Sequence, residues 1–275
     1  MISILEKYFP TLKEKLAIDL SVFDPAFLER TITSRMASNS IKSADLYLNN
    51  LQENKEEQTE LARALNNSYS EFFRNPLTFT YLEQVILPQL IERKKARNEN
   101  EIRIWSSACA SGQEAYSLAI LCDELIETTN AKIAYRIFAT DICEDEIDHA
   151  QKGVYNAITL NKVTLKRIQT YFARRGDTYS VAVLLKEYID FSTFDLLLAH
   201  GACPPASVYG NFDVVFCSNL LFYYQSEYRK RILEKIGNSL APGGYLVTGE
   251  SEREIAKRNN FREVFINSGI FQKRQ

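Results

Sequence analysis

Residues 101–126 constrain the fold more than any other part of the chain. Glu101–Trp105 alternates polar and apolar residues, as a half-buried strand does. A loop of small residues follows, and then apolar residues recur at helical spacing: Ala115, Leu118, Ala119, Cys122, Leu125 and Ile126. A strand, a tight loop and an amphipathic helix form the first unit of a doubly wound sheet. We therefore predict an α/β fold.

The segments that follow repeat this alternation. Ala134–Thr140 is predicted as a second strand, which Asp141 closes before a helix that runs to about Lys152. Further along, the pattern predicts a buried strand at 212–217, a helix at about 227–240, a strand at 245–248 after the turn Pro242-Gly-Gly, and a final hairpin within 261–273. The sheet is therefore expected to be Rossmann-like.

Two regions lie outside that alternation. From about residue 4 to 65, apolar residues recur every three or four positions and glycine is absent, which predicts an all-α N-terminal domain at 1–62. The α/β domain is then expected at 63–275. Within it, Tyr179–Leu185 and Glu187–Phe191 look like strands of a small antiparallel β insertion at about 171–191.

The composition excludes several classes of protein. Lysine plus arginine number 33 and aspartate plus glutamate 35, and the formal charge of −2 argues against nucleic-acid binding. The five scattered cysteines predict reduced thiols, with no disulfide framework and no metal site. Without a signal peptide or an apolar run of about 20 residues, we expect a cytoplasmic protein with no membrane insertion. His149 and His200 are the only histidines, and we expect both at the surface, so the chemistry should need no histidine base.

The loop from Ser106 to Glu114 is the first candidate site. Small residues let a ligand approach the backbone, and the N-terminus of the next helix offers free N–H groups and the positive end of a dipole. Such a loop suits a carboxylate or a phosphate. It has one glycine and no G-x-G-x-x-G motif, which disfavours a nicotinamide dinucleotide. Taken alone, the segment is also consistent with an ordinary tight connection.

Polar residues follow two other predicted strands. Asp141 comes directly after the second strand, where a carboxylate commonly accepts hydrogen bonds from ribose hydroxyls, although an aspartate there also suits a helix N-cap. The strand at 212–217 delivers Ser218 and Asn219 to the carboxyl edge of the sheet, where open α/β folds bind ligands. The aromatic run at 222–224 either walls a pocket or packs in the core.

Ser70-Glu-Phe-Phe-Arg74 has two adjacent aromatic residues followed by an arginine, as in a helix that docks against a domain core. In isolation, the guanidinium of Arg74 is better interpreted as a surface charge.

These segments occur in the order and spacing of a known family. F-F-R-N-P at 72–76, W-S-S-A-C-A-S-G-Q-E-A-Y-S at 105–117, A-T-D-I at 139–142 and F-D-V-V-F-C-S-N-L-L-F-Y-Y at 212–224 together resemble the CheR-type chemotaxis receptor glutamate O-methyltransferases. The resemblance covers nearly the whole chain. It implies an S-adenosylmethionine-dependent methyltransferase fold and transfer of a methyl group to glutamate carboxylates of a chemoreceptor, leaving S-adenosylhomocysteine.

The resemblance also implies site residues. Arg74 and Tyr223 would be the catalytic residues, near the transferred methyl group. Glu114 would contact the amino acid part of the cofactor, Asp141 the ribose hydroxyls, and Asp195-Leu196 the adenine. The implied cofactor-binding set is Ser68, Ser70, Arg74, Ala108, Gly112, Glu114, Asp141, Asp195, Leu196, Ser218 and Asn219.

The implied partner is the cytoplasmic helical domain of a chemoreceptor-like protein. In the family the β insertion docks on the receptor, and the N-terminal domain presents arginines to the methylated helix; Arg30 and Arg35 are the nearest counterparts. We expect a monomer.

Several positions depart from the family pattern. Ser218 stands where the family has arginine, and Ser68, Gln113 and Asp195 also differ from the usual residues. Serine cannot replace the permanently charged, forked donor of an arginine. The alternative hypothesis is therefore a catalytically weakened module that binds the cofactor and acts in signalling through protein contacts.

Overall fold

A computed structural model describes residues 9–16, 18–66, 69–129, 132–197, 201, 203–207 and 209–274. They fall into two compact units. The first contains the described residues up to 66 together with Phe222–Arg229, and the second contains those from Tyr69 to Leu221 and from Lys230 to Arg274. The boundary proposed from sequence at residues 62–63 falls inside helix α5 (Lys55–Leu65). The assignment of residues 222–229 to the first unit was not predicted.

The first unit is built from helices. They are α2 (Phe9–Leu16), the short helix η2 (Leu20–Val22), α3 (Pro25–Ser38), α4 (Ala44–Glu53) and α5. Helix α3 begins where the side chain of Asp24 accepts hydrogen bonds from the N–H groups of Ala26 and Phe27, with Pro25 in the first turn. Apolar residues from these helices form one core, which includes Phe27, Leu28, Ile32, Leu48, Leu51 and Leu61.

The returning segment packs on the start of α3. It comprises the end of the short helix η5 (Leu221–Tyr223) and the first turn of α12 (Ser226–Ser239). The N–H of Asp24 donates to the carbonyl of Tyr223 at 2.7 Å, and the ring of Tyr224 stacks on Phe23 at 5.6 Å. Arg229 pairs with the carboxylate of Asp24 at 2.9 Å. These contacts explain why 222–229 belong to the helical unit.

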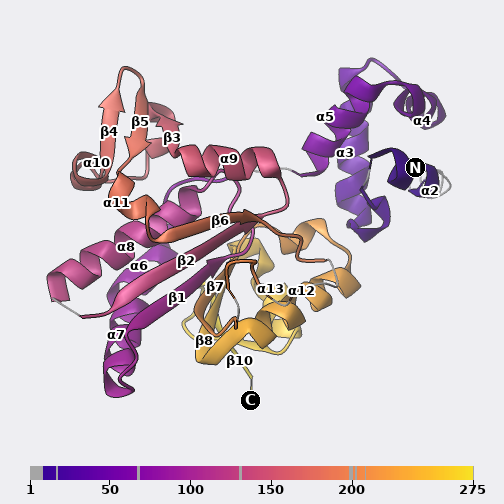
Figure 1. Cartoon of the computed structure of the whole chain (residues 1–275). Helices are drawn as coiled ribbons and strands as arrows, with labels where there is room; N and C mark the ends of the chain where they lie inside the picture. Colours follow the sequence, from indigo (N-terminus) through magenta and orange to yellow (C-terminus); the bar gives the residue numbers. More distant parts are fainter. Residues whose placement is uncertain are drawn as a thin grey trace. The chain divides into compact units, whose positions relative to one another are not determined.

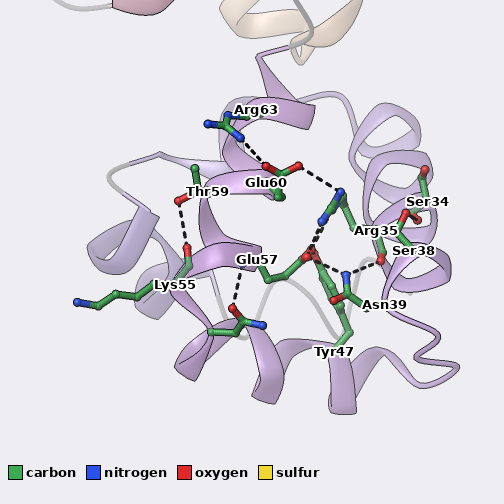
Figure 2. A network of polar contacts seen from close by, with 11 residues as sticks. Ser34, Arg35, Ser38, Asn39, Tyr47, Lys55, Glu57, Thr59, Glu60 and Arg63 are labelled. Carbon is green, nitrogen blue, oxygen red and sulfur yellow. Dashed lines mark hydrogen bonds and ion pairs between the residues drawn. The ribbon is translucent and has the colours of Figure 1, made fainter.

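A buried carboxylate joins three helices of the first unit (Figure 2). Glu57 on α5 is 3% exposed, and it accepts hydrogen bonds from Nε and Nη2 of Arg35 at 2.9 and 2.5 Å. The amide of Asn39 and the hydroxyl of Tyr47 each donate to the same carboxylate at 2.7 Å. The negative charge of Glu57 is therefore balanced by Arg35 on α3, by Asn39 directly after α3, and by Tyr47 on α4.

The second unit contains a seven-stranded sheet (Figure 1). Its strands follow the order β6 (Ile189–Thr193), β2 (Ala134–Asp141), β1 (Glu101–Ser106), β7 (Phe212–Cys217), β8 (Leu240–Thr248), β10 (Ile270–Lys273) and β9 (Phe261–Glu263). The first five run parallel, and β10 is antiparallel to both of its neighbours. The prediction of an α/β, Rossmann-like fold is confirmed, including the final hairpin.

Helices accompany the parallel strands. They are α6 (Pro76–Tyr81), the π-helical turn η3 (Leu82–Ile86), α7 (Leu87–Ala96), α8 (Gln113–Thr129), α9 (Glu144–Lys152), α12, the short helix η6 (Glu250–Glu252) and α13 (Arg253–Arg258). All six residues of β7 are buried, because a central parallel strand is covered on both faces. The carboxyl ends of β1, β2, β6, β7 and β8 consequently meet at one edge of the sheet.

A separate three-stranded sheet contains β3 (Val154–Asn156), β5 (Thr178–Val181) and β4 (Phe172–Arg175), in that order (Figure 1). Beside these strands lie η4 (Ala157–Leu160), α10 (Leu165–Tyr171) and α11 (Val183–Lys186). The predicted insertion at 171–191 includes β4 and β5, but it was wrong for Glu187–Phe191, because Ile189–Thr193 forms β6 and pairs with β2 in the main sheet. Alternation identifies a strand but does not identify its partner.

Candidate cofactor site

A pocket opens at the carboxyl edge of the large sheet. It is lined by Tyr69, Ser70, Glu71, Arg74, Asn75, Thr78, Phe79, Ala108, Ala110, Glu114, Phe216, Ser218 and Asn219. Of the predicted cofactor-binding residues, the lining includes Ser70, Arg74, Ala108, Glu114, Ser218 and Asn219. The pocket thus gathers residues that lie up to 150 positions apart in sequence, from Tyr69 to Asn219.

Four of the remaining predicted cofactor-binding residues lie outside this lining. Gly112, Asp141, Asp195 and Leu196 are not part of this lining. Ser68 and His200 lie outside the described residues. Gly112 has φ +91°, and a Cβ there would stand 2.8 Å from the Cβ of Ala150 on α9. Its glycine is therefore explained by close packing of the loop against α9.

The loop after β1 is fixed by its neighbouring strands. The N–H of Ser107 donates to the carbonyl of Phe216 on β7, and the N–H of Cys109 to Thr140 on β2, both at 2.9 Å. Ala110 adopts a positive φ of 46°, and its N–H donates to Oδ2 of Asp141 at 2.9 Å. Hydrogen bonds to β7 on one side and to β2 on the other therefore fix the backbone of this pocket wall.

Glu114 supplies a carboxylate at the start of α8. Ser106, the last residue of β1, donates its hydroxyl to Oε1 of Glu114 at 2.6 Å. Burial raises the pKa of Glu114 to about 7, against the opposing effects of that hydrogen bond and of the positive charge of Arg74, while Glu252 raises it further. A ligand cation placed here would favour the ionised carboxylate.

Arg74 is placed by a short loop that precedes α6. The N–H of Phe73, whose φ is +50°, donates to the hydroxyl of Ser117 on α8 at 3.0 Å. The guanidinium of Arg74 donates to the carbonyl of Tyr69 at 2.8 Å and lies 5.1 Å from the centre of its ring. Arg74 is partly buried and lines the pocket, so it is more than a solvated surface charge.

Asp141 organises the edge of the sheet beside the pocket. Its Oδ2 accepts from Ala110 and its Oδ1 accepts from the N–H of Cys143 at 3.0 Å. Burial raises the pKa of Asp141, and the backbone hydrogen bonds oppose this shift. Helix α9 has Cys143 as its N-cap, so Asp141 is not the N-cap residue that the alternative interpretation required.

The residues predicted for the adenine follow the neighbouring strand β6. The N–H of Phe194 donates to the carbonyl of Asp141 at 2.9 Å, which joins the two strand ends. Asp195 accepts a hydrogen bond from the N–H of Leu197 at 2.7 Å, and Leu196 is buried.

Tyr223, the second predicted catalytic residue, belongs to the helical unit. Its ring lies 4.7 Å from that of Phe27. A hollow on this unit is lined by Phe27, Arg30, Thr31, Ser34, Arg35, Ala64, Phe222 and Tyr223. Arg30 is exposed there, whereas the guanidinium of Arg35 is held by Glu57. The guanidinium of Arg35 is thus bound to Glu57 in its own unit while its side chain also lines the hollow, and its presentation to a partner stays a prediction.

Sequence reasoning missed Glu252, a fully buried carboxylate beside the pocket. It also missed the lining residues Tyr69, Glu71, Asn75, Thr78, Phe79, Ala110 and Phe216. The signal available for Glu252 was its position in Gly249-Glu-Ser-Glu252, directly after a predicted strand whose carboxyl end lies at the ligand-binding edge.

The described ranges contain neither a cluster of metal-binding side chains nor a helix that could span a membrane. No group of three or more His, Cys, Asp or Glu side chains in those ranges is arranged to hold a metal ion. None of the helices that the structure describes is long and apolar enough to cross a membrane.

Comparison with known proteins identifies relatives. The profile of the family described as "CheR methyltransferase, SAM binding domain" matches residues 68–270. "Chemotaxis protein methyltransferase 1" of Pseudomonas aeruginosa is 33% identical over 211 residues, which cover 75% of this chain and 74% of that protein. "Chemotaxis protein methyltransferase" of Listeria monocytogenes is 29% identical over 272 residues, covering 95% and 98% of the two chains.

These matches include the segments that form the pocket, and S-adenosylmethionine is therefore the cofactor of this fold. The chain belongs to the CheR methyltransferase family of S-adenosylmethionine-dependent enzymes.

Proposed function

We propose that the chain transfers a methyl group from S-adenosylmethionine to glutamate carboxylates on the cytoplasmic helical domain of a chemoreceptor. The observation that carries the proposal is the convergence of Glu114 and Arg74 on one pocket at the carboxyl edge of the sheet. A carboxylate can bind the ammonium group of the cofactor, and a guanidinium can bind an anionic substrate. The names of the relatives, which are chemotaxis protein methyltransferases, favour a receptor as the substrate.

The residues present suit the cofactor. Glu114 would bind its ammonium group, and Asp141 would accept hydrogen bonds from the ribose hydroxyls. Asp195-Leu196 would border the adenine. Ser70, Ala108, Ser218 and Asn219 would contact the remaining parts of the cofactor. Glu114 lies at the start of α8, and the other positions lie at or shortly after the end of a strand or in the loop that carries Arg74.

The proposed chemistry needs no general base. A glutamate carboxylate is ionised at neutral pH, because its reference pKa is about 4.3. The cofactor supplies an activated methyl group on a sulfonium. Holding the carboxylate in line with that methyl group contributes up to about 7–11 kcal/mol in favourable model reactions. Arg74 would orient the carboxylate loosely, since a tight ion pair would stabilise the ground state more than the transition state.

Methylation of a receptor tests the proposal. The full chain is incubated with methyl-labelled S-adenosylmethionine and the cytoplasmic domain of a chemoreceptor from the same organism. We expect label in base-labile methyl esters on glutamates of the receptor. Label in base-stable groups would contradict O-methylation, and turnover on free small acids without the receptor would contradict a protein substrate.

A second candidate is a cofactor-binding signalling module with little or no turnover. The observation that favours it is the hydroxyl of Ser218, which is buried at the pocket and has no hydrogen-bond partner among the residues that the structure describes. A buried hydroxyl normally has a hydrogen-bond partner. The unpartnered hydroxyl of Ser218 therefore suggests that serine does not fully replace the arginine that the family has at this position. Binding of S-adenosylhomocysteine without methyl transfer to any receptor would support this candidate, and activity gained in Ser218→Arg would support it further.

Binding of the cofactor is expected to depend on pH through Glu114. Because burial raises its pKa to about 7, this carboxyl is largely protonated at pH 6 and largely ionised at pH 8. We expect calorimetric titration to show S-adenosylhomocysteine binding about tenfold more weakly at pH 6 than at pH 8. Glu114→Gln should bind weakly at both values. A variant that keeps the wild-type pH profile would assign the titration to another carboxyl whose pKa burial also raises, such as Glu252 or Asp141.

A further inference from the structure

Glu252 lies in the short helix η6, directly beyond the end of β8. Its side chain is completely buried. Oε1 accepts hydrogen bonds from the N–H groups of Leu220 and Leu221 at 2.7 and 2.6 Å. Oε2 accepts from the N–H groups of Asn219 and Gly249 at 2.6 and 2.9 Å. Four backbone donors from two loops therefore converge on one carboxylate.

In the part of the chain that the structure describes, the donors to the carboxylate of Glu252 are backbone N–H groups. Among the described residues, no lysine or arginine forms an ion pair with it. Burial raises the pKa of Glu252, and the four backbone hydrogen bonds oppose that shift. Burying a carboxylate is costly unless its oxygens accept hydrogen bonds of this kind. The four N–H groups therefore suit a carboxylate, whose two oxygens each accept two of the hydrogen bonds.

The backbone that Glu252 binds is a wall of the cofactor pocket. Ser218 and Asn219 line the pocket, and Asn219 adopts a left-handed conformation with φ +61°. Three consecutive N–H groups, from Asn219 to Leu221, point at the carboxylate, which fixes the turn in this unusual conformation. Phe222, the next residue, already belongs to the helical unit. Glu252 therefore holds the chain to the sheet at the point where it leaves the second unit.

Gly249 packs closely against the side chains of Asn219 and Glu252. A Cβ at this position would lie 2.9 Å from Nδ2 of Asn219 and 3.0 Å from Oε2 of Glu252. The backbone of Gly249, with φ −68°, is one that alanine also adopts. An alanine here would therefore disturb the two side chains without straining its own backbone.

We propose that Glu252 is a positioning residue of the cofactor pocket: its carboxylate holds Asn219 and the preceding Ser218 in the geometry that receives S-adenosylmethionine. The inference depends on the cofactor and is independent of the proposed glutamate substrate. A residue with a purely structural role would affect the stability of the fold and leave the affinity of the folded protein unchanged.

The test compares Glu252→Gln with Glu263→Gln in the full chain. Glu263 is a matched control, because its side chain is 10% exposed, pairs with Lys257 at 3.2 Å and accepts from the N–H of Gly269 at 3.2 Å. It lies in the same C-terminal region and is not part of the pocket lining. S-adenosylhomocysteine is titrated calorimetrically into each folded protein, and chemical unfolding is measured in parallel.

We expect Glu252→Gln to bind S-adenosylhomocysteine at least tenfold more weakly than the wild type, because the amide keeps one acceptor oxygen and turns N–H donors toward the backbone donors. Glu263→Gln should keep wild-type affinity even where it loses stability. If Glu252→Gln does not fold, Gly249→Ala supplies the measurement, with the same expected loss of affinity. Wild-type affinity in a folded Glu252→Gln, or in Gly249→Ala where Glu252→Gln does not fold, would overturn the proposal.

Discussion

Replacing Asp141 with alanine is expected to weaken binding of S-adenosylhomocysteine by about 100-fold or more. The variant removes the proposed acceptor for the ribose hydroxyls, and it also releases the N–H of Ala110 from the pocket wall. Hydrogen bonds to charged groups contribute about 1.5–3 kcal/mol each, so losing two corresponds to at least two powers of ten in affinity. Calorimetric titration of the purified variant measures the effect directly.

Two further variants test whether the loss of affinity comes from the side-chain oxygens of Asp141. Asp148→Ala removes an exposed carboxylate on the following helix and should bind as the wild type does. Asp141→Asn keeps one side-chain oxygen and should retain part of the affinity, because that oxygen can still accept from Ala110 or Cys143. Affinity within a factor of three of the wild type in a folded Asp141→Ala would contradict the placement of the ribose beside this residue.

The parts of the fold that could be predicted from sequence are those with local signals. The β1–α8–β2 unit was predicted because alternation, a small-residue loop and helical spacing follow one another within about 40 residues. Asp141 was identified for the same reason, since its position after a strand places it at the ligand-binding edge. The parallel register of β1 and β7 pairs Ser106 with Phe216, so the carboxyl ends of these two strands lie side by side.

The parts that could not be predicted depend on partners far away in the chain. The strand Ile189–Thr193 shows the same alternation whether it pairs with β2 or with β5, so its sheet could not be assigned. Arg35 looks like any exposed helical arginine until Glu57, 22 positions later, is placed against it. Glu252 binds backbone groups about 30 positions earlier, and backbone donors leave no trace in residue types.

The second large effect concerns the stability of the helical unit. Arg35→Met keeps most of the side-chain volume and leaves the carboxylate of Glu57, which is 3% exposed, without its cation (Figure 2). Removing one partner of a buried ion pair typically costs about 3–5 kcal/mol. We expect a loss of that size at pH 7, measured by hydrogen exchange at the amides of α3 and α5. Lys13→Met removes an exposed pair with Asp19 and should leave the stability almost unchanged, because solvent screens such a pair.

The pH dependence distinguishes a lost ion pair from lost packing. In the wild type, burial raises the pKa of Glu57, but the hydrogen bonds from Arg35, Tyr47 and Asn39 outweigh it and hold the pKa below its usual value. The stabilisation from Glu57 is therefore complete above its unfolded pKa and is lost as the pH falls through the folded value. In Arg35→Met the buried carboxyl takes up a proton more readily, so the stability difference between the two proteins should shrink at acidic pH. A difference that stays constant from pH 7 to pH 4 would mean that the arginine acts through its packing alone.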